Sequence, residues 1–243
     1  MSSVREQVDP IATRTFTSDP HLVMMSGPGT PIAERYRQLR LRLDQGTAES
    51  PGPYQVTVIT SAIPGEGKTT TAINLALAFA ENRKRRTLLV DADLRCPSVC
   101  RYLVREPALG LSEVLSGEAS LDQALIAMSG NLWILPSGAP SETPLALLQA
   151  RSLGSLITEL RERFDRIVID TPPTVPFTDA AVLASRSDGA LLVVRAGKTT
   201  RPLIRRALGS LSEARLRGVV LNDVAFTVVD KYYYRYDDAE ARA

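Results

Sequence analysis

Residues 54–80 read YQVTVITSAIPGEGKTTTAINLALAFA, and this stretch decides the fold. Its first part, residues 54–60, is apolar and rich in β-branched side chains, which indicates a buried strand, and residues 69–83 have the pattern of a helix. Between them lies AIPGEGKT, residues 62–69. A strand, a glycine-rich loop that ends in Lys-Thr and a helix, in this order, are the signature of a phosphate-binding P-loop.

The residue types in this loop suit the phosphates of a nucleotide. Two glycines let the backbone wrap around phosphate oxygens, and the start of the following helix favours negative charge. Lys68 can reach the outer phosphates, and the hydroxyl of Thr69 can ligate Mg²⁺. The usual first glycine is replaced by Ala62, and a plain glycine-rich turn is the alternative interpretation. The ATP-binding residues predicted from the loop are Pro64, Gly65, Glu66, Gly67, Lys68, Thr69 and Thr70.

Strands and helices continue to alternate along the chain. Further strands are predicted at 86–91, 131–137, 165–170, 189–196 and 218–223, with helices at 144–164 and 201–216. Apolar strands separated by helices predict an α/β P-loop NTPase fold, a mostly parallel sheet with helices on both faces in a single domain. Ligands of such sheets bind beyond the carboxyl ends of the strands.

Acidic residues follow two of the predicted strands. LLVDADLR, residues 88–95, places Asp91 and Asp93 just past one strand, and RIVIDTPP, residues 166–173, places Asp170 at the end of another. Asp170 has the position of a Walker B aspartate, which holds Mg²⁺ directly or through water. Each aspartate taken singly is equally consistent with a helix cap, but three of them together with a P-loop favour a nucleotide site.

Composition argues against several other classes of protein. The 29 basic and 27 acidic residues leave a net charge of +2, which gives no reason to expect nucleic acid as a partner. Cys96 and Cys100 have no second pair and the single histidine is distant, so no zinc site or disulfide is predicted, and both cysteines are expected to be buried. Without a membrane-spanning run or a signal peptide, the protein is expected to be cytoplasmic.

The ends of the chain differ from its centre. Residues 1–30 lack periodicity and are predicted to form a flexible arm, residues 31–50 a separate helical unit, residues 51–226 the P-loop domain and residues 227–243 a tail. Thr30 can cap the helix, whose predicted apolar face consists of Ile32, Tyr36, Leu39 and Leu43.

The tail concentrates tyrosine. DKYYYRYDD, residues 230–238, contains Tyr232, Tyr233, Tyr234 and Tyr236 out of seven tyrosines in the protein. The run follows neither a helical nor a strand period and its flanks are charged, so it is predicted to be exposed. Either the run docks as an aromatic patch or the phenolic hydroxyls are substrates.

These motifs together resemble those of the bacterial tyrosine kinases of capsule and exopolysaccharide synthesis (BY-kinases of the CpsD/CapB type), over roughly residues 20–238. SAIPGEGKTT is similar to their Walker A motif, LLVDADLR to their additional Walker A′ motif and RIVIDTPP to their Walker B motif. The resemblance implies an ATP- and Mg²⁺-dependent protein-tyrosine autokinase that regulates polysaccharide synthesis and export. The tail tyrosines would be its autophosphorylation sites.

The resemblance also assigns roles to single residues. Asp91 would accept the proton of the tyrosine hydroxyl, and Asn222 would border the adenine. Phosphoryl transfer needs charge neutralisation, alignment and a base near the acceptor, so these roles are chemically consistent. The role of Arg95 stays open. The implied catalytic residues are Lys68, Asp91, Asp93 and Asp170, and the implied metal ligands are Thr69, Asp93 and Asp170.

Assembly and partners follow from the same resemblance. Glu34, Arg37 and Arg40 form an E-x-x-R-x-x-R stripe, expected opposite the apolar face, which in this family builds a ring of subunits, an octamer. A merely solvated charged face is the alternative. Phosphorylation would then occur in trans within the ring. A membrane protein of the chain-length regulator type is the implied activator, and it would recruit the chain to the inner face of the plasma membrane.

Two other interpretations remain open from the sequence. ATPase switches of the MinD/ParA type share the fold, but they carry a signature lysine where this chain has Ile63, and Pro-Gln commonly stands where Leu94 and Arg95 occur. A nucleotide-binding scaffold with a docking tail is the third interpretation. A scaffold has no need of the complete set of carboxylates, which argues against it.

Overall fold

The computed structural model describes residues 19–47, 50–103, 109–128, 130–212 and 214–225. The tyrosine run at 230–238 and most of the predicted arm lie outside these residues. Among the helices of the described part, none is both long and apolar enough to cross a bilayer.

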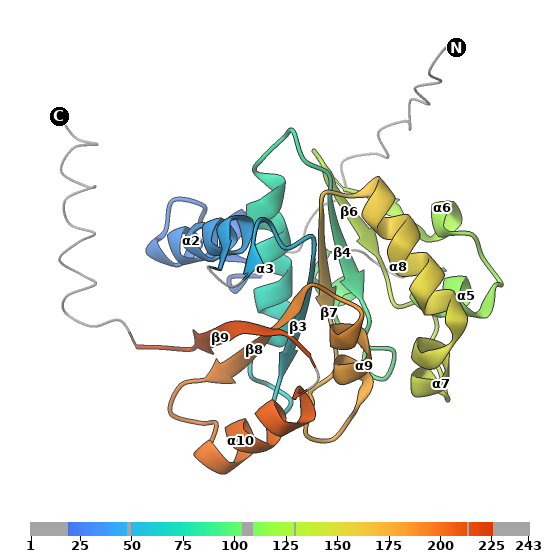
Figure 1. Cartoon of the computed structure of the whole chain (residues 1–243). Coiled ribbons are helices and arrows are strands. Elements are labelled where there is room, and N and C mark those ends of the chain that lie inside the picture. The colour runs from blue at the N-terminus through green and yellow to red at the C-terminus, as the bar shows by residue number, and fades with distance from the viewer. Residues whose placement is uncertain (1–18, 48–49, 104–108, 129, 213, 226–243) are drawn as a thin grey trace.

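A seven-stranded sheet forms the centre of the molecule, with the order β5-β6-β4-β7-β3-β8-β9 (Figure 1). All neighbouring strands are parallel except β5, which runs antiparallel to β6. The predicted mostly parallel sheet is therefore confirmed, and only the two-residue β5, too short to show a period, was missed. The strands are β3 (Val56–Ser61), β4 (Thr87–Asp91), β5 (Ile126–Ala127), β6 (Leu132–Leu135), β7 (Arg166–Asp170), β8 (Gly189–Arg195) and β9 (Leu216–Asn222).

Helices cover both faces of the sheet. Figure 1 shows α2 and α3 on one side and α8 and α9 on the other. A short antiparallel pair, β1 (Gly46–Thr47) and β2 (Ser50–Pro51), follows α2. The helices are α1 (Val23–Ser26), α2 (Pro31–Gln45), α3 (Lys68–Ala80), α4 (Val99–Leu103), α5 (Leu111–Ser116), α6 (Leu121–Ala124), α7 (Pro144–Gln149), α8 (Arg151–Arg163), α9 (Asp179–Ser185) and α10 (Arg201–Ser210).

The alternation of side chains along the central strands divides the core into two layers. In β7, Ile167 and Ile169 pack with the layer of α5 to α10, whereas Val168 between them packs with the layer of α1 to α4. All five residues of β7 are buried. A strand covered on both faces needs apolar residues at every position, which explains the continuous apolar runs of the sequence.

Local predictions failed in three places within these layers. The helix predicted at 201–216 ends at Ser210, and Leu216 already belongs to β9. The helix predicted at 144–164 is interrupted at Ala150, which is extended with ψ of 154° and separates α7 from α8. Alanine favours helix, so only the packing of the two segments explains the break. Helix α9 was not predicted, although Thr178-Asp179 before an apolar run is a recognisable helix start.

The predicted arm is too long. Residues from Asp19 onwards fold onto α3, and Leu22 and Met24 are buried. The side chain of Asn74 on α3 accepts a hydrogen bond from Met24 N at 3.1 Å and donates one to the carbonyl of His21 at 2.8 Å. These two hydrogen bonds hold the segment against α3. The prediction of a flexible arm is therefore wrong for residues 19–30.

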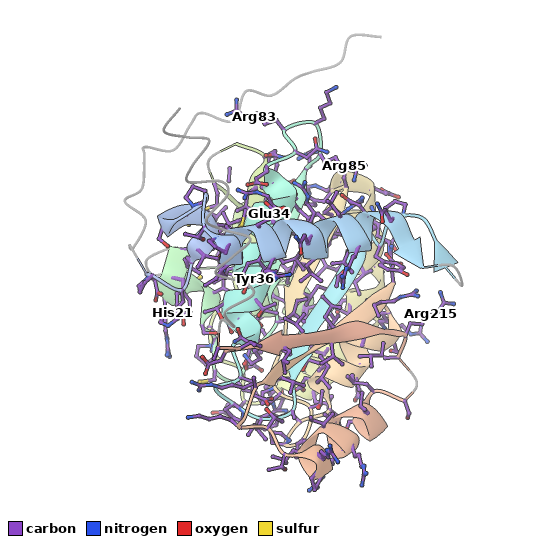
Figure 2. The ribbon with its side chains drawn as sticks, turned by 90° about the vertical axis from the view of Figure 1, so that its left-hand side faces the viewer. His21, Glu34, Tyr36, Arg83, Arg85 and Arg215 are labelled. Atoms are coloured by element: carbon purple, nitrogen blue, oxygen red, sulfur yellow. The ribbon has the colours of Figure 1, made fainter. Side chains whose placement is uncertain are left out.

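Helix α2 packs by most of the predicted face, since Leu43 is buried and Tyr36 and Leu39 pack against core residues. The cap is confirmed, since Thr30 Oγ1 accepts a hydrogen bond from Ala33 N. Ile32, however, is 41% exposed, while Ala33 is buried. Figure 2 shows α2 across one side of the molecule, with Glu34 and Tyr36 labelled on it.

The charged stripe of α2 does not lie opposite its packed face. Arg37 Nη2 lies 2.7 Å from Glu81 Oε1, and Arg40 Nη1 donates to the carbonyl of Ala78 at 2.9 Å, both at the end of α3. Positions 33, 37 and 40 share one helical face, and the long arginine stems cover the apolar surface beside Ala33. The prediction of the stripe's direction is therefore wrong, and all three of its members have partners within the chain, since Arg37 also lies 3.3 Å from Glu34.

Candidate functional site

The P-loop joins β3 to α3 at the carboxyl edge of the sheet. A cavity of about 1230 Å³ opens there. The order of the strands brings the acidic motifs to this edge, because β7 lies between β3 and β4 and its Asp170 pairs in register with Asp91. Residues predicted from separate motifs that line this cavity include Pro64, Gly65, Gly67, Lys68, Thr69, Thr70, Asp93 and Asn222.

The P-loop backbone has the conformation that glycine allows. Gly65 and Gly67 have φ of 80° and 90°. The side chain of Glu66 is buried and turns back into the loop, where Oε2 accepts a hydrogen bond from Ile63 N at 2.9 Å and Oε1 accepts one from the hydroxyl of Thr199. Glu66 therefore braces the loop rather than lining the cavity. This bracing role was not predicted.

Asn222 lies against the same loop. Its Nδ2 donates to the carbonyl of Glu66 at 2.9 Å. A Cβ atom added to Gly67 would lie 2.1 Å from that nitrogen. Whether Asn222 also borders the adenine stays a prediction.

Replacing Gly67 by alanine should prevent nucleotide binding. The left-handed backbone and the clash with Asn222 both oppose a side chain there, so the loop would have to change shape. We expect the affinity for ADP to fall at least about 100-fold, the equivalent of about 2.7 kcal/mol. Isothermal titration calorimetry measures this. Gly209→Ala, in α10 with open space around the new methyl group, is the matched control and should bind normally.

Lys68 and Asp93 lie at the floor of the cavity, and the carboxylates of Asp91 and Asp170 near them are fully buried. Lys68 Nζ lies 3.0 Å from Asp93 Oδ2 and 4.0 Å from Asp170 Oδ2. The Thr69 hydroxyl donates to Asp170 Oδ2 at 2.7 Å and is also 2.9 Å from Ser98 Oγ, a contact not predicted from the sequence. Burial lowers the pKa of Lys68, but the charges of Asp170 and Asp93 outweigh burial and raise it. Lys68 therefore stays protonated at neutral pH, held by the neighbouring carboxylates.

Asp170 has an unused ligand atom. Its side chain is fully buried, and Oδ1 has no hydrogen-bond partner among the described residues. Burial raises the pKa of Asp170 to about 7, although the charge of Lys68 opposes the rise. A buried, unpaired carboxylate oxygen is costly unless a cation or donor satisfies it, which fits a divalent cation.

The chemistry of this donor set fits Mg²⁺ at a nucleotide. Among the described residues, no group of three or more His, Cys, Asp or Glu side chains forms a metal site made by protein alone. Mg²⁺ at nucleotides typically takes only one or two carboxylates, with phosphate and water completing the shell. Asp93, Asp170 and Thr69 have oxygen atoms of the type that such a site uses, and their role as metal ligands stays a prediction.

The raised pKa values predict a pH dependence. An acid whose pKa is raised on folding binds protons more tightly in the folded state, so its contribution to stability is present below its ordinary value of 3.8 and is lost as the pH rises through about 7. Mg²⁺ favours the ionised form. We therefore expect Mg²⁺ to raise the melting temperature more at about pH 8 than at about pH 5.5. Asp170→Asn should remove this difference, and an equal effect of Mg²⁺ at both pH values would contradict the expectation.

Asp91 organises the loop that follows β4. Its Oδ1 accepts a hydrogen bond from Asp93 N at 3.2 Å, and its Oδ2 accepts bonds from Ser98 N at 3.1 Å and Val99 N at 3.0 Å. Burial raises the pKa of Asp91 to about 6, and these backbone donors limit the rise. Its role as the proton acceptor stays a prediction, because both oxygens hold backbone groups here.

Arg95 has partners that the sequence did not reveal. Its Nε donates to Asp179 Oδ2 at 2.7 Å, and its guanidinium carbon lies 4.4 Å from the centre of the Phe177 ring.

The two cysteines differ from the prediction that both are buried. Cys96 is exposed, so the prediction is wrong for this residue. Cys100 is partly buried, and burial raises the pKa of its thiol to about 12. Its thiol is therefore unreactive at neutral pH.

Comparisons with known proteins cover most of the chain. The family model of an AAA domain matches residues 55–200. The chain is 34% identical over 217 residues to tyrosine-protein kinase YwqD of Bacillus subtilis (strain 168), covering 88% of this chain and 90% of YwqD. It is 40% identical over 182 residues to tyrosine-protein kinase CpsD of Streptococcus pneumoniae serotype 4 (strain ATCC BAA-334 / TIGR4), covering 73% and 79% of the two chains.

A solved structure agrees with these relatives. The kinase domain of Escherichia coli tyrosine kinase ETK superposes with a TM-score of 0.78 at 27% identity, covering 88% of this chain and 84% of that one. The similarity to YwqD extends over almost the whole length of both chains and is not confined to the P-loop. The chain therefore belongs to the bacterial tyrosine kinases of the CpsD and YwqD type, within the P-loop superfamily that includes MinD and ParA.

Proposed function

We propose that this chain transfers the γ-phosphoryl group of MgATP to tyrosines of its own C-terminal tail and thereby regulates capsule or exopolysaccharide synthesis and export. The observation that carries the proposal is the contact of Lys68 with Asp93 and Asp170 beside the hydroxyl of Thr69, with Oδ1 of Asp170 left unpaired. This arrangement suits the phosphates of a nucleotide and its metal ion. Bound Mg²⁺ would neutralise charge on the transferred phosphoryl group.

The chain's own residues would divide the work. The P-loop amides and Lys68 would hold the β- and γ-phosphates, while Thr69, Asp93 and Asp170 would supply the metal ligands. Asp91 would receive the proton of the acceptor hydroxyl. Residues 51–226 would form the kinase domain, residues 31–50 would contact the neighbouring subunit, and residues 227–243 would carry the acceptors.

The test is incubation with ATP and Mg²⁺ followed by intact mass and peptide mapping. We expect phosphate on Tyr232, Tyr233, Tyr234 or Tyr236. ATP hydrolysis without phosphotyrosine, even with the membrane activator supplied, would instead favour a MinD/ParA-like ATPase switch and leave the tyrosines as a docking patch.

Phosphorylation in trans needs its own test, because the chain permits both routes. The described part ends at Ala225, which lines the nucleotide cavity. Tyr232 follows seven residues later, and seven extended residues span about 25 Å, enough to return to the same cavity. We propose the trans route. A tagged Lys68→Met protein mixed with unaltered protein should gain tail phosphate, and a Lys68→Met tail that stays unmodified would show that transfer occurs in cis.

The stripe on α2 should hold a ring of subunits together. We expect Arg37→Glu with Arg40→Glu, which leaves only acidic residues in the stripe, to reduce the oligomer, measured by light scattering with ATP and Mg²⁺, to its monomer mass. Because Arg37 also binds Glu81 within the chain, Glu81→Gln is the matched control, which breaks that internal pair and leaves the stripe intact. A ring that survives the first variant, or dissolves equally in the control, would show that the stripe is not the interface.

Phosphorylation should loosen such a ring. Each phosphate adds about −1.5 to −2 charge, so four on one tail add roughly −6 to −8 and are repelled by the carboxylates of Asp91, Asp93 and Asp170. A cytoplasmic segment of a membrane chain-length regulator is the proposed activator, which docks beside the nucleotide cavity and brings the kinase to the inner face of the plasma membrane. Equal phosphorylation with and without such a segment would count against this partner.

A further inference from the structure

The cavity at the P-loop is larger than one small ligand requires. Its volume is about 1230 Å³, whereas pockets for single ligands are typically about 300–1,000 Å³. Part of its lining comes from α1, α2 and the end of β9, and a second part, called the second wall below, comes from the loop after β4, from α4 and from the loop after β7. Lys68 and Thr69 also line it. The cavity therefore has room for a nucleotide and for a second group.

The second wall combines rings with cations. Pro172, Pro173 and Phe177 line it, together with Arg95 and Arg101. This is also the wall that carries Asp93, whose carboxylate contacts Lys68. A group that rests on this wall is thus next to the charged floor of the site.

Arg95 is held rigidly in this wall. Two of its guanidinium nitrogens bind Asp179, which is only 1% exposed, at 2.7 and 3.3 Å. One face stacks on Phe177. Its remaining nitrogen, Nη1, has no hydrogen-bond partner within the described residues. Arg95 and Phe177 thus form a rigid surface in the cavity, on which Nη1 of Arg95 can still donate a hydrogen bond.

Arg101 is the second cation of this wall. It is exposed on α4, and its side chain forms no ion pair with any residue that the structure describes. The floor carries Asp93 beside Lys68, and the buried carboxylates of Asp91 and Asp170 near it add to the repulsion of an acidic segment. Cations on the adjoining wall offset this repulsion.

We propose that this second wall is the acceptor subsite, and that it selects tyrosines followed by acidic residues. The occupant is the tail segment Tyr236-Asp237-Asp238 of this protein, whose charge complements Arg95 and Arg101. The tyrosine ring packs on Pro172, Pro173 and Phe177, and the two aspartates face the arginines. The proposal rests on the proposed kinase function and adds the residues that choose the acceptor.

The step served by this subsite is ordinary phosphoryl transfer. The phenolic oxygen forms a bond to the γ-phosphorus of ATP, and the bond from that phosphorus to the bridging oxygen of ADP breaks. The phenolic proton passes to a carboxylate of the site. The subsite contributes position, because the reacting oxygen must lie in line with the leaving oxygen.

The test is a double-mutant cycle between protein and peptide, with the full chain as the enzyme. The peptides carry residues 230–238 either unchanged or with Asp237→Asn and Asp238→Asn. The enzymes are the unaltered chain, Arg101→Gln and the matched control Arg205→Gln, an exposed arginine of α10 that does not line the cavity. Thermal melts confirm that each variant is folded.

We expect Arg101→Gln to raise the KM for the acidic peptide at least about fivefold, a factor that corresponds to about 1 kcal/mol, with a much smaller change in the KM for ATP. With the unaltered enzyme, the neutral peptide should have a higher KM than the acidic peptide. Arg101→Gln should raise this KM little further, because the peptide no longer carries the charges of Asp237 and Asp238. Arg205→Gln should change neither constant.

Two results would overturn different claims. Independent, additive effects of the protein and peptide changes would show that Arg101 does not meet the acidic residues, and the subsite would be wrong while the kinase stands. Phosphorylation of neither peptide by the unaltered chain, with its own tail also unmodified, would overturn the proposed function itself.

Discussion

Replacing Lys68 by methionine is expected to abolish phosphorylation of the tail tyrosines. Lys68 is the cation that contacts both Asp93 and Asp170, and without it nothing at that position offsets these two carboxylates beside the phosphates. Removing a single preorganised group that stabilises charge in a transition state lowers the rate by a factor of about 10²–10³. The loss of this full charge should reach at least the upper end of that range. Intact mass and peptide mapping after incubation with ATP and Mg²⁺ measure it.

The control for this variant is Lys84→Met, an exposed lysine in the turn after α3. It removes the same charge from the protein as a whole and should leave tail phosphorylation unchanged. Phosphate on Tyr232 to Tyr236 of Lys68→Met protein incubated alone would contradict the assignment of Lys68. A melting temperature close to that of the unaltered chain shows that the variant is folded.

Replacing Asp170 by asparagine should have the second largest effect. The amide keeps the shape of the side chain and can still accept the hydrogen bond from Thr69, but it loses the charge and one strong metal ligand. A metal ion contributes several kcal/mol to such transition states, and each 1.36 kcal/mol is a factor of ten in rate. We expect a loss of about 10³ in the rate of phosphorylation.

A measurement independent of activity checks the cause. Mn²⁺ binding in the presence of ADP, followed by electron paramagnetic resonance, should weaken markedly in Asp170→Asn. Asp188→Asn is the matched control, because Asp188 also borders a strand but stands immediately before β8, at the opposite edge of the sheet, paired with Arg161. Unchanged Mn²⁺ affinity in Asp170→Asn would remove Asp170 from the metal site.

Much of the fold and of the site follows from local sequence. The P-loop, the strands and the carboxylates at the ends of β4 and β7 were predicted where the structure has them, because glycine conformation, apolar runs and strand ends are local properties. Parallel strands place their carboxyl ends on one edge, so the sequence also predicted that Asp91, Asp93 and Asp170 lie near the P-loop.

Only the tertiary structure decided which side chains pair. Asp170 meets Thr69 because β7 inserts between β3 and β4, an order that local patterns do not specify. The same holds for Arg95 with Asp179, 84 positions apart, and for Arg37 with Glu81, 44 positions apart. Residues far apart in the chain become neighbours through strand order and helix crossings, and these depend on packing of the whole core. The sequence therefore determined which chemical groups the site contains, and the packing determined which group each of them touches.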